Sequence, residues 1–367
     1  MSCRQMPLHT VRYLPVLCLV ALVATNVYLY RLPGRHRYRL VPTPLPAEAS
    51  NASAAPPAEV SNASTAPPVV ASNASAGPPI TSQAADRACA QGYAAVTDAE
   101  GLLRRNAGLT RRQKPRRIAY LTMYDCEERM LELHLREMAS VDLFLVGESK
   151  YSNANTLRGQ CFPHSNPVVS AHKNLTYIYN TEHVKRFTYW EAEVRNRDQL
   201  GEHLCSSPEA AQFQDDDLVM ISDMDEILSA VFVDLLAHYD GWGEGLSVSL
   251  RWSYYGFQWV NPNLFKVNLA VTWRRFREHS CKANAIRFNL METRKHRVVE
   301  GVVGWHCSWC FPTDHFQHKL RHLAHVELAT ERNMDLGYLT SMREQGLWFA
   351  TGEPNGCLGT QEELPWS

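Results

Sequence analysis

Short apolar runs alternate with amphipathic stretches from residue 117 to about residue 350, and this alternation predicts strands and helices in turn. Residues 118–123 (IAYLTM) and 141–146 (VDLFLV) are predicted strands. Between them, an acidic stretch suited to the first turn of a helix precedes apolar residues at mostly helical spacing from Met130 to Met138. The strand–helix–strand pattern is typical of two parallel strands joined by a helix.

The same alternation continues along the chain. A charged helical stretch, 190–204, lies between predicted strands at 175–179 and 218–221, and later strands are predicted at 246–252 and 269–273. Strands that alternate with helices indicate an α/β fold with a mainly parallel central sheet covered on both faces, although the last two strands also suit an antiparallel arrangement. The sequence contains neither a Gly-x-Gly-x-x-Gly fingerprint nor a Walker motif, so a dinucleotide-binding fold and a P-loop are not supported.

An uncharged segment of eighteen residues, 13–30, precedes this region and has tyrosine at both ends. Its length and its terminal tyrosines predict a transmembrane anchor. A cleaved signal peptide is the alternative, but cleavage after Ala24 would place Leu22 where a small residue is needed. Basic residues that follow the segment argue for the opposite membrane orientation, namely Arg31, Arg35, Arg37 and Arg39.

Three repeats with a period of eleven residues follow, within residues 40–85. Each repeat has paired prolines and an Asn-x-Ser acceptor for N-glycosylation, at Asn51, Asn62 and Asn73, and Asn174 begins another acceptor sequence. Because the prolines exclude a helix, the repeats predict an extended, disordered stem. The acceptors indicate that the chain after the anchor is lumenal, and this outweighs the arginines.

The composition agrees with a folded lumenal protein. The 367 residues include 37 Lys or Arg and 38 Asp or Glu, a formal net charge of -1, which excludes the strongly basic surface of a nucleic-acid-binding protein. An even number of cysteines follows the apolar segment, which permits disulfides in an oxidising compartment but leaves the pairing open. They are Cys89, Cys126, Cys161, Cys205, Cys281, Cys307, Cys310 and Cys357.

An acidic turn directly follows the predicted strand 218–221. It contains Asp223 and Asp225, at the carboxyl end of a strand, where open α/β sheets bind ligands. Two carboxylates there suit a hard divalent cation such as Mn²⁺ or Mg²⁺, which neutralises a diphosphate leaving group in nucleotide-sugar transferases. Asp223 can instead be a helix N-cap, with Glu226 completing a capping box. An Asp-x-Asp phosphohydrolase is a further alternative.

A second motif, Cys307-Ser-Trp-Cys310, follows His306. A redox pair and a zinc site with His315 and His318 are both conceivable, but in an oxidising lumen a structural disulfide is expected. His306 is a candidate to complete the coordination of Mn²⁺, although a core histidine is the more common fate of such a residue.

Two further groups of side chains allow more than one interpretation. Histidines recur at helical spacing after Asp314, and they form either a metal-binding face or, as we prefer, one solvated side of a helix. They are His315, His318, His322 and His325. The aromatic residues within 254–259, with Trp305 and Trp309, suit either sugar stacking or core packing.

Together, several blocks of sequence resemble the β-1,4-mannosyl-glycoprotein 4-β-N-acetylglucosaminyltransferase family, glycosyltransferase family 17. The blocks are 223–227 (DMDEI), 239–242 (YDGW) with 255–259 (YGFQW), and 304–311 (GWHCSWCF), and the segment 144–149 also resembles the start of that family's domain. The likeness covers about residues 117–350, and the block 304–311 is its most specific part.

The resemblance implies a GT-A-like fold and an enzyme that transfers GlcNAc from UDP-GlcNAc to the β-mannose of an N-glycan, with inversion. It implies Mn²⁺ as cofactor and a single-pass type II protein of the Golgi membrane. It assigns Asp223 and Asp225 to the cation and the diphosphate, and Glu148 is a further candidate for cofactor binding. Leu228 replaces a proline of the family, and the short region after Trp348 leaves acceptor recognition and activity open.

Inversion requires a general base that accepts the proton of the attacking hydroxyl. The candidates are Asp314, Glu226, Asp240 and Glu148. We favour Asp314, because it follows the distinctive cysteine block, although it can also be the N-cap of the next helix.

These observations predict five segments: a cytoplasmic tail (1–12), the anchor (13–30), the stem and linker (31–116), the catalytic domain (117–350) and a C-terminal tail (351–367). A catalytically silent, glycan-binding lumenal relative is the main alternative to an active transferase, and a lumenal phosphohydrolase is the weaker one.

Overall fold

The computed structural model describes residues 96–183, 189–288, 296–354 and 357–358. The predicted anchor, the repeats of the stem and Cys89 lie outside these residues. Within them, no helix has both the length and the apolar character needed to cross a membrane.

The strands are β1 (Thr110–Arg111), β2 (Ile118–Met123), β3 (Leu143–Ser149), β4 (Leu175–Asn180), β5 (Leu218–Ile221), β6 (Glu226–Leu228), β7 (Tyr239–Asp240), β8 (Gly245–Tyr254), β9 (Trp259–Val260), β10 (Phe265–Thr272), β11 (His296–Ser308) and β12 (Cys357–Leu358). The α-helices are α3 (Ala99–Arg105), α4 (Glu128–Glu137), α5 (Pro167–Ala171), α6 (Tyr189–Ser206), α7 (Ala230–His238), α8 (Trp273–Glu278), α9 (Ala283–Phe288), α10 (Thr313–His322) and α11 (Leu336–Gln345). The 3₁₀ helices are η1 (Pro208–Gln212), η2 (Val326–Leu328) and η3 (Arg332–Met334).

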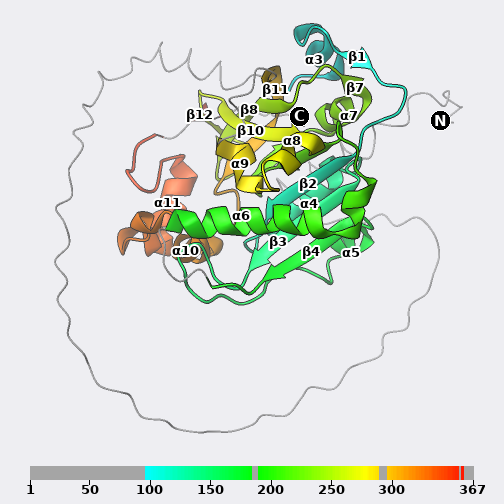
Figure 1. Cartoon of the computed structure of the whole chain (residues 1–367). Coiled ribbons are helices and arrows are strands. Elements are labelled where there is room, and N and C mark those ends of the chain that lie inside the picture. Colours follow the sequence, from blue (N-terminus) through cyan, green and yellow to red (C-terminus); the bar gives the residue numbers. More distant parts are fainter. Residues whose placement is uncertain (1–95, 184–188, 289–295, 355–356, 359–367) are drawn as a thin grey trace, which may run out of the picture. The chain divides into compact units, whose positions relative to one another are not determined.

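A mixed sheet forms the centre of the described fold (Figure 1). Strands β4, β3, β2 and β5 are parallel neighbours in that order, which confirms the predicted α/β half of the molecule. Beyond β5, strands β10, β8 and β9 continue the sheet with antiparallel pairs, and β11 pairs with β8 in parallel and with β6 antiparallel. The prediction of a mainly parallel sheet was therefore wrong for this half, where short connections between β8, β9 and β10 favour antiparallel neighbours.

One face of the parallel strands is covered by α6 (Figure 1). Alternate side chains of each strand, such as Leu121 and Leu145, point to this face and pack against Leu200 and Leu204 of the helix. All four of these side chains are almost completely buried. The α/β layering therefore follows from the period-two and helical patterns of the sequence.

The opposite face carries Tyr120 and Phe144, which pack near His134 of α4. The Nε2 atom of His134 lies 2.8 Å from the carbonyl oxygen of Met224, and its Nδ1 lies 3.0 Å from the hydroxyl of Tyr120. Since the carbonyl can only accept, Nε2–H donates to it and Nδ1 accepts from the tyrosine. Burial lowers the pKa of His134 to about 4, which keeps the ring neutral. Helix α4 is thereby bonded to the turn that follows β5.

The folded part begins before residue 117. Helix α3 packs against β11 and α7, and the backbone amide of Thr97 donates to the carbonyl of Val302 at 2.8 Å. Strand β1 pairs antiparallel with β7. The predicted linker 31–116 therefore contains a segment, from residue 96, that belongs to the folded unit.

A second core joins α10 and α11 to the end of β8. It contains Tyr255, Phe316, Leu339 and Phe349, all buried. The hydroxyl of Tyr255 donates to the carbonyl of Leu347 at 2.8 Å. The aromatic patch in 254–259 thus contributes to packing, which was one of its two interpretations.

Three disulfides lie within the described residues: Cys126–Cys161, Cys205–Cys281 and Cys307–Cys310. The last one confirms the expected structural role of the Cys307-Ser-Trp-Cys310 motif.

Candidate functional site

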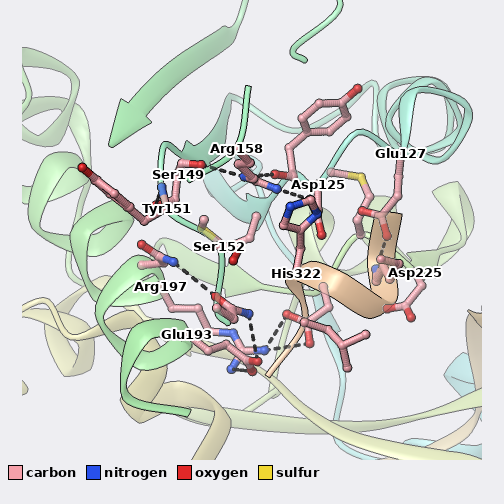
Figure 2. Close-up of a pocket in the computed structure, with 18 residues that line it drawn as sticks. Asp125, Glu127, Ser149, Tyr151, Ser152, Arg158, Glu193, Arg197, Asp225 and His322 are labelled. Carbon is pink, nitrogen blue, oxygen red and sulfur yellow. Dashed lines mark hydrogen bonds and ion pairs between the residues drawn. The ribbon is translucent and has the colours of Figure 1, made fainter. Parts of the chain in front are cut away.

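A cavity of about 210 Å³ opens at the carboxyl ends of β2, β3 and β5, where parallel sheets bind ligands. Segments far apart in the sequence supply its walls: the loops after these strands, the first half of α6 and the end of α10. Figure 2 shows the labelled residues around this space, with the ring of Tyr151 pointing away from it. The acidic, basic and histidine residues that line it are Asp125, Glu127, Arg158, Glu193, Arg197, Asp223, Asp225, Lys319 and His322.

The first carboxylate of the acidic turn is shared by two arginines. Arg197 Nη2 donates to both carboxylate oxygens of Asp223 at 2.8 Å, and Arg287 Nη2 donates to Oδ2 at 3.2 Å. Burial alone would raise the pKa of Asp223, but the charges of Arg197 and Arg287 lower it well below its usual range. Asp223 is therefore ionised at neutral pH and holds Arg197 at the cavity.

Glu226 lies behind the turn rather than in the cavity. Its side chain is 1% exposed and accepts two hydrogen bonds from Arg287, at 2.6 and 2.7 Å. It also accepts from the backbone amide of Asp223 at 3.0 Å, which is half of the predicted capping box. The helix itself begins later than predicted, at α7, with Ser229 as its N-cap, because Glu226–Leu228 forms strand β6. Glu226 is thus fully engaged in holding the turn.

The second carboxylate of the turn, Asp225, differs from the others. Within the part of the chain that the structure describes, it is the one cavity carboxylate that neither an arginine nor a lysine contacts. Its side chain is 26% exposed, and its Oδ1 lies 3.9 Å from Nδ1 of His306. Its backbone carbonyl accepts from the amide of Cys307 at 2.8 Å, which brings the turn and β11 together.

Two contacts orient the ring of His306. Its ring stacks on Phe265 with centroids 3.8 Å apart, and its Nε2 lies 2.8 Å from Oγ of Ser308. Nδ1 is buried and makes no hydrogen bond to any described residue. The geometry presents this buried nitrogen to Asp225, so these two residues can be tested as a pair of metal ligands.

The other wall of the cavity carries two ion pairs. Arg158 contacts Asp125, and Lys319 contacts Glu127. Burial raises the pKa of Glu127 to about 7, assisted by the charge of Asp125 and opposed by Lys319. His318 Nε2 lies 3.3 Å from Oδ1 of Asp125. Cys126 is also close to these two residues, but its sulfur is bonded to Cys161, so it offers no thiolate for a metal.

The remaining sequence candidates do not line this cavity. Glu148 is buried beside it and accepts hydrogen bonds from the amides of Cys161 and Phe162, at 2.7 and 3.2 Å, so that it holds the following loop. Asp240 lies in β7, at the amino end of β5, where Arg112 and Arg116 contact it. It lines a different cavity, of about 240 Å³.

Asp314 lies in the first turn of α10, where it is exposed and accepts from the amide of His315 at 2.9 Å. It is not the N-cap of this helix, which is Pro312. Asp314 and His315 line a neighbouring cavity that shares Glu127 with the first one. The structure therefore brings Asp223, Asp225 and His306 together and leaves Asp240 and Asp314 apart from them.

Several cavity residues were not among the sequence candidates. Asp125 and Glu127 belong to the acidic stretch that predicts a helix start, although they follow β2, whose carboxyl end lies beside that of its parallel neighbour β5. Glu193 and Arg197 form an i,i+4 ion pair at 2.7 Å on α6, which resembles any surface pair in the sequence. Lys319 lies among the histidines that predict a solvated side of a helix.

Comparisons with known proteins identify the family of the chain. The family model of glycosyltransferase family 17 matches residues 88–344. A β-1,4-mannosyl-glycoprotein 4-β-N-acetylglucosaminyltransferase of Mus musculus is 31% identical over 175 residues, 41% of this chain and 30% of the relative. Relatives of the same name from Rattus norvegicus and Homo sapiens are 27% identical over 289 residues, 70% of this chain and 51% and 52% of their own lengths. The chain spans about half the length of these two relatives. It belongs to glycosyltransferase family 17.

Proposed function

We propose that the protein transfers GlcNAc from UDP-GlcNAc to the β-mannose of an N-glycan core in β1,4 linkage, with inversion and with a divalent cation, Mn²⁺ or Mg²⁺. The family match and the names of the relatives support a GlcNAc transferase. The observation that carries the proposal is the pair formed by Asp225 and His306, at the carboxyl ends of the parallel strands.

The donor atoms present fit a metal ion. Two protein ligands that each lie about 2.0–2.2 Å from one ion are separated by no more than about 4.4 Å. Oδ1 of Asp225 and Nδ1 of His306 are 3.9 Å apart, and the nitrogen is buried without a hydrogen-bond partner among the described residues. When bound, the cation supplies positive charge that stabilises the UDP leaving group. Asp223 was predicted as a further ligand, but its contacts favour a role in positioning Arg197.

The chain's own cations assist in binding the diphosphate. Arg158, Arg197 and Lys319 line the cavity from three different segments. Each is held by a carboxylate, so that its orientation is set before the donor binds. Guanidinium and ammonium groups of this kind donate charge-assisted hydrogen bonds to phosphate oxygens.

Glu127 is our candidate for the general base. Glu127 lines the cavity, and its pKa is about 7. A pKa near neutrality suits a group that must accept a proton at physiological pH. Asp314, which the sequence favoured, and Asp240 and Glu148 are not in contact with this cavity. Glu127 would accept the proton of the attacking acceptor hydroxyl.

We also propose that the protein is anchored in the Golgi membrane by residues 13–30, with the catalytic domain in the lumen. The glycosylation acceptors and the three disulfides support a lumenal domain. Protease treatment of sealed Golgi vesicles tests this: the domain after residue 96 should be degraded only after detergent is added.

Transfer is tested with the full-length protein in detergent. Purified protein is incubated with UDP-GlcNAc and a panel of defined N-glycans, with Mn²⁺ and with a chelator. We expect product only with the metal, and loss of transfer in Asp225→Asn. Asp234→Asn, the same change at an exposed position of α7, is the matched control and should retain activity. If no UDP-sugar and glycan combination gives product, the protein is a silent relative and the proposal is wrong.

A further inference from the structure

A largely exposed tryptophan lies on the same helix as two cavity residues. Trp190 is in the first turn of α6 and is 49% exposed. Glu193 and Arg197 line the cavity and follow Trp190 by three and seven positions, so all three side chains lie along one face of the helix. Trp190 therefore stands at the rim of the cavity, about 10 Å along the helix axis from Arg197.

A second segment fixes the position of this tryptophan. The ring of His325 contacts Trp190 edge to face, with centroids 4.8 Å apart and planes at 88°. His325 follows the cavity residue His322 by three positions, and its Nδ1 lies 2.6 Å from Oε1 of Glu327. In Figure 1, α6 and α10 lie close together at this end of α6. The tryptophan is thus supported from the side while half of its surface remains open.

Two asparagines of the cavity wall are hydrogen-bonded near the start of α6. Nδ2 of Asn153 donates to Glu193 at 3.3 Å, and Nδ2 of Asn196 donates to Oδ1 of Asn153 at 3.3 Å. Both asparagines line the cavity. Amide groups that both donate and accept, beside an exposed aromatic surface, form a surface that suits a sugar, which has hydroxyl groups on its edge and C–H groups on its faces.

We propose that Trp190, supported by His325, is the platform on which the acceptor oligosaccharide stacks. The platform is more than one sugar ring away from Arg197 along α6, so it contacts a sugar next to the one that is modified. This inference rests on the proposed glycosyltransferase function, since it identifies the acceptor part of the same site. It predicts that Trp190 contributes to acceptor binding and not to donor binding.

The test compares Trp190→Ala and Trp190→Phe with wild type in the full-length protein. Initial rates are measured against N-glycan acceptor at saturating UDP-GlcNAc, and against UDP-GlcNAc at saturating acceptor. Loss of the stacking surface should raise the acceptor KM about tenfold in Trp190→Ala, with partial recovery in Trp190→Phe and an unchanged donor KM. Leu336→Ala, an apolar change at an exposed helix position away from the cavity, should behave as wild type.

A second readout separates this inference from the proposed function. Binding of the same N-glycan is measured by saturation-transfer NMR, with UDP present. If wild type binds glycan without transferring GlcNAc and Trp190→Ala loses this binding, Trp190 is the glycan-stacking residue but the proposed transferase function is wrong. If wild type transfers GlcNAc and Trp190→Ala keeps the acceptor KM of wild type, the platform is wrong. If wild type neither binds nor transfers, both are wrong.

Discussion

Replacement of Arg287 by methionine tests whether the ion pairs behind the acidic turn hold the site together. Arg287 is on α9, and its side chain is 9% exposed. It donates two hydrogen bonds to Glu226, whose side chain is 1% exposed, and one to Asp223. Methionine retains much of the apolar volume but removes the charge and all three bonds.

The expected loss follows from the burial of Glu226. Without Arg287, this carboxylate would remain inside the protein, and among the described residues its donors would be the hydroxyl of Ser222 and the amide of Asp223. Removing one partner of a buried ion pair typically costs about 3–5 kcal/mol of the free energy of unfolding. For a domain of this size, that corresponds to a decrease in Tm of about 10 °C.

Thermal unfolding of the full-length protein measures this loss. Arg195→Met is the matched control, because Arg195 is also paired with two carboxylates but is 33% exposed, and surface pairs contribute only about 0–1 kcal/mol. The double variant Arg287→Met/Glu226→Gln should recover part of the loss, since a neutral amide is less costly to bury than a carboxylate. Equal decreases in Tm for Arg287→Met and Arg195→Met would refute the reasoning.

Three further predictions concern the site and its support. Glu127→Gln should lower kcat by a factor of about 10²–10⁴. In the wild type, kcat should fall below pH 7 as Glu127 becomes protonated, and this decrease should be absent from the variant. If the variant keeps the decrease, Glu127 is not the base. Asp314→Asn should keep most of the transfer activity, because this exposed side chain lies outside the cavity; a loss as large as that of Glu127→Gln would restore Asp314 as the base. His134 has a pKa of about 4 when folded and about 6.5 when unfolded, so stability should decrease by about 3 kcal/mol as pH falls from above 6.5 to below 4. His134→Phe should lack this part of the pH dependence in urea unfolding, and an unchanged profile would contradict the assignment.

The sequence predicts the parallel half of the fold well, because its central strands β2, β3 and β5 are buried on both faces. The runs 118–123 and 218–221 have the same bounds as β2 and β5. Strand β11 was not predicted, although it spans thirteen residues, because its two glycines interrupt the pattern of a strand. The two-residue strands β9 and β12 carry too little pattern to be found.

The sequence also predicts only some of the residues of the candidate site. Asp223 and Asp225 were identified because they directly follow a buried strand, a relation that is local in the sequence. Arg287 was not, because its contact with the turn spans 61 residues and depends on how α9 packs. Asp240 was a candidate for the base because its block of sequence resembles the family. The fold places it at the other end of β5, away from the cavity.

The acidic turn is attached to the rest of the protein on several sides. The carbonyl of Met224 accepts from His134, that of Asp225 accepts from Cys307, and the side chain of Glu226 accepts from Arg287. Such a turn is preorganised, so the backbone that carries Asp225 does not have to rearrange when a ligand binds. Conformational entropy lost on binding would then come from the bound molecules rather than from this part of the protein.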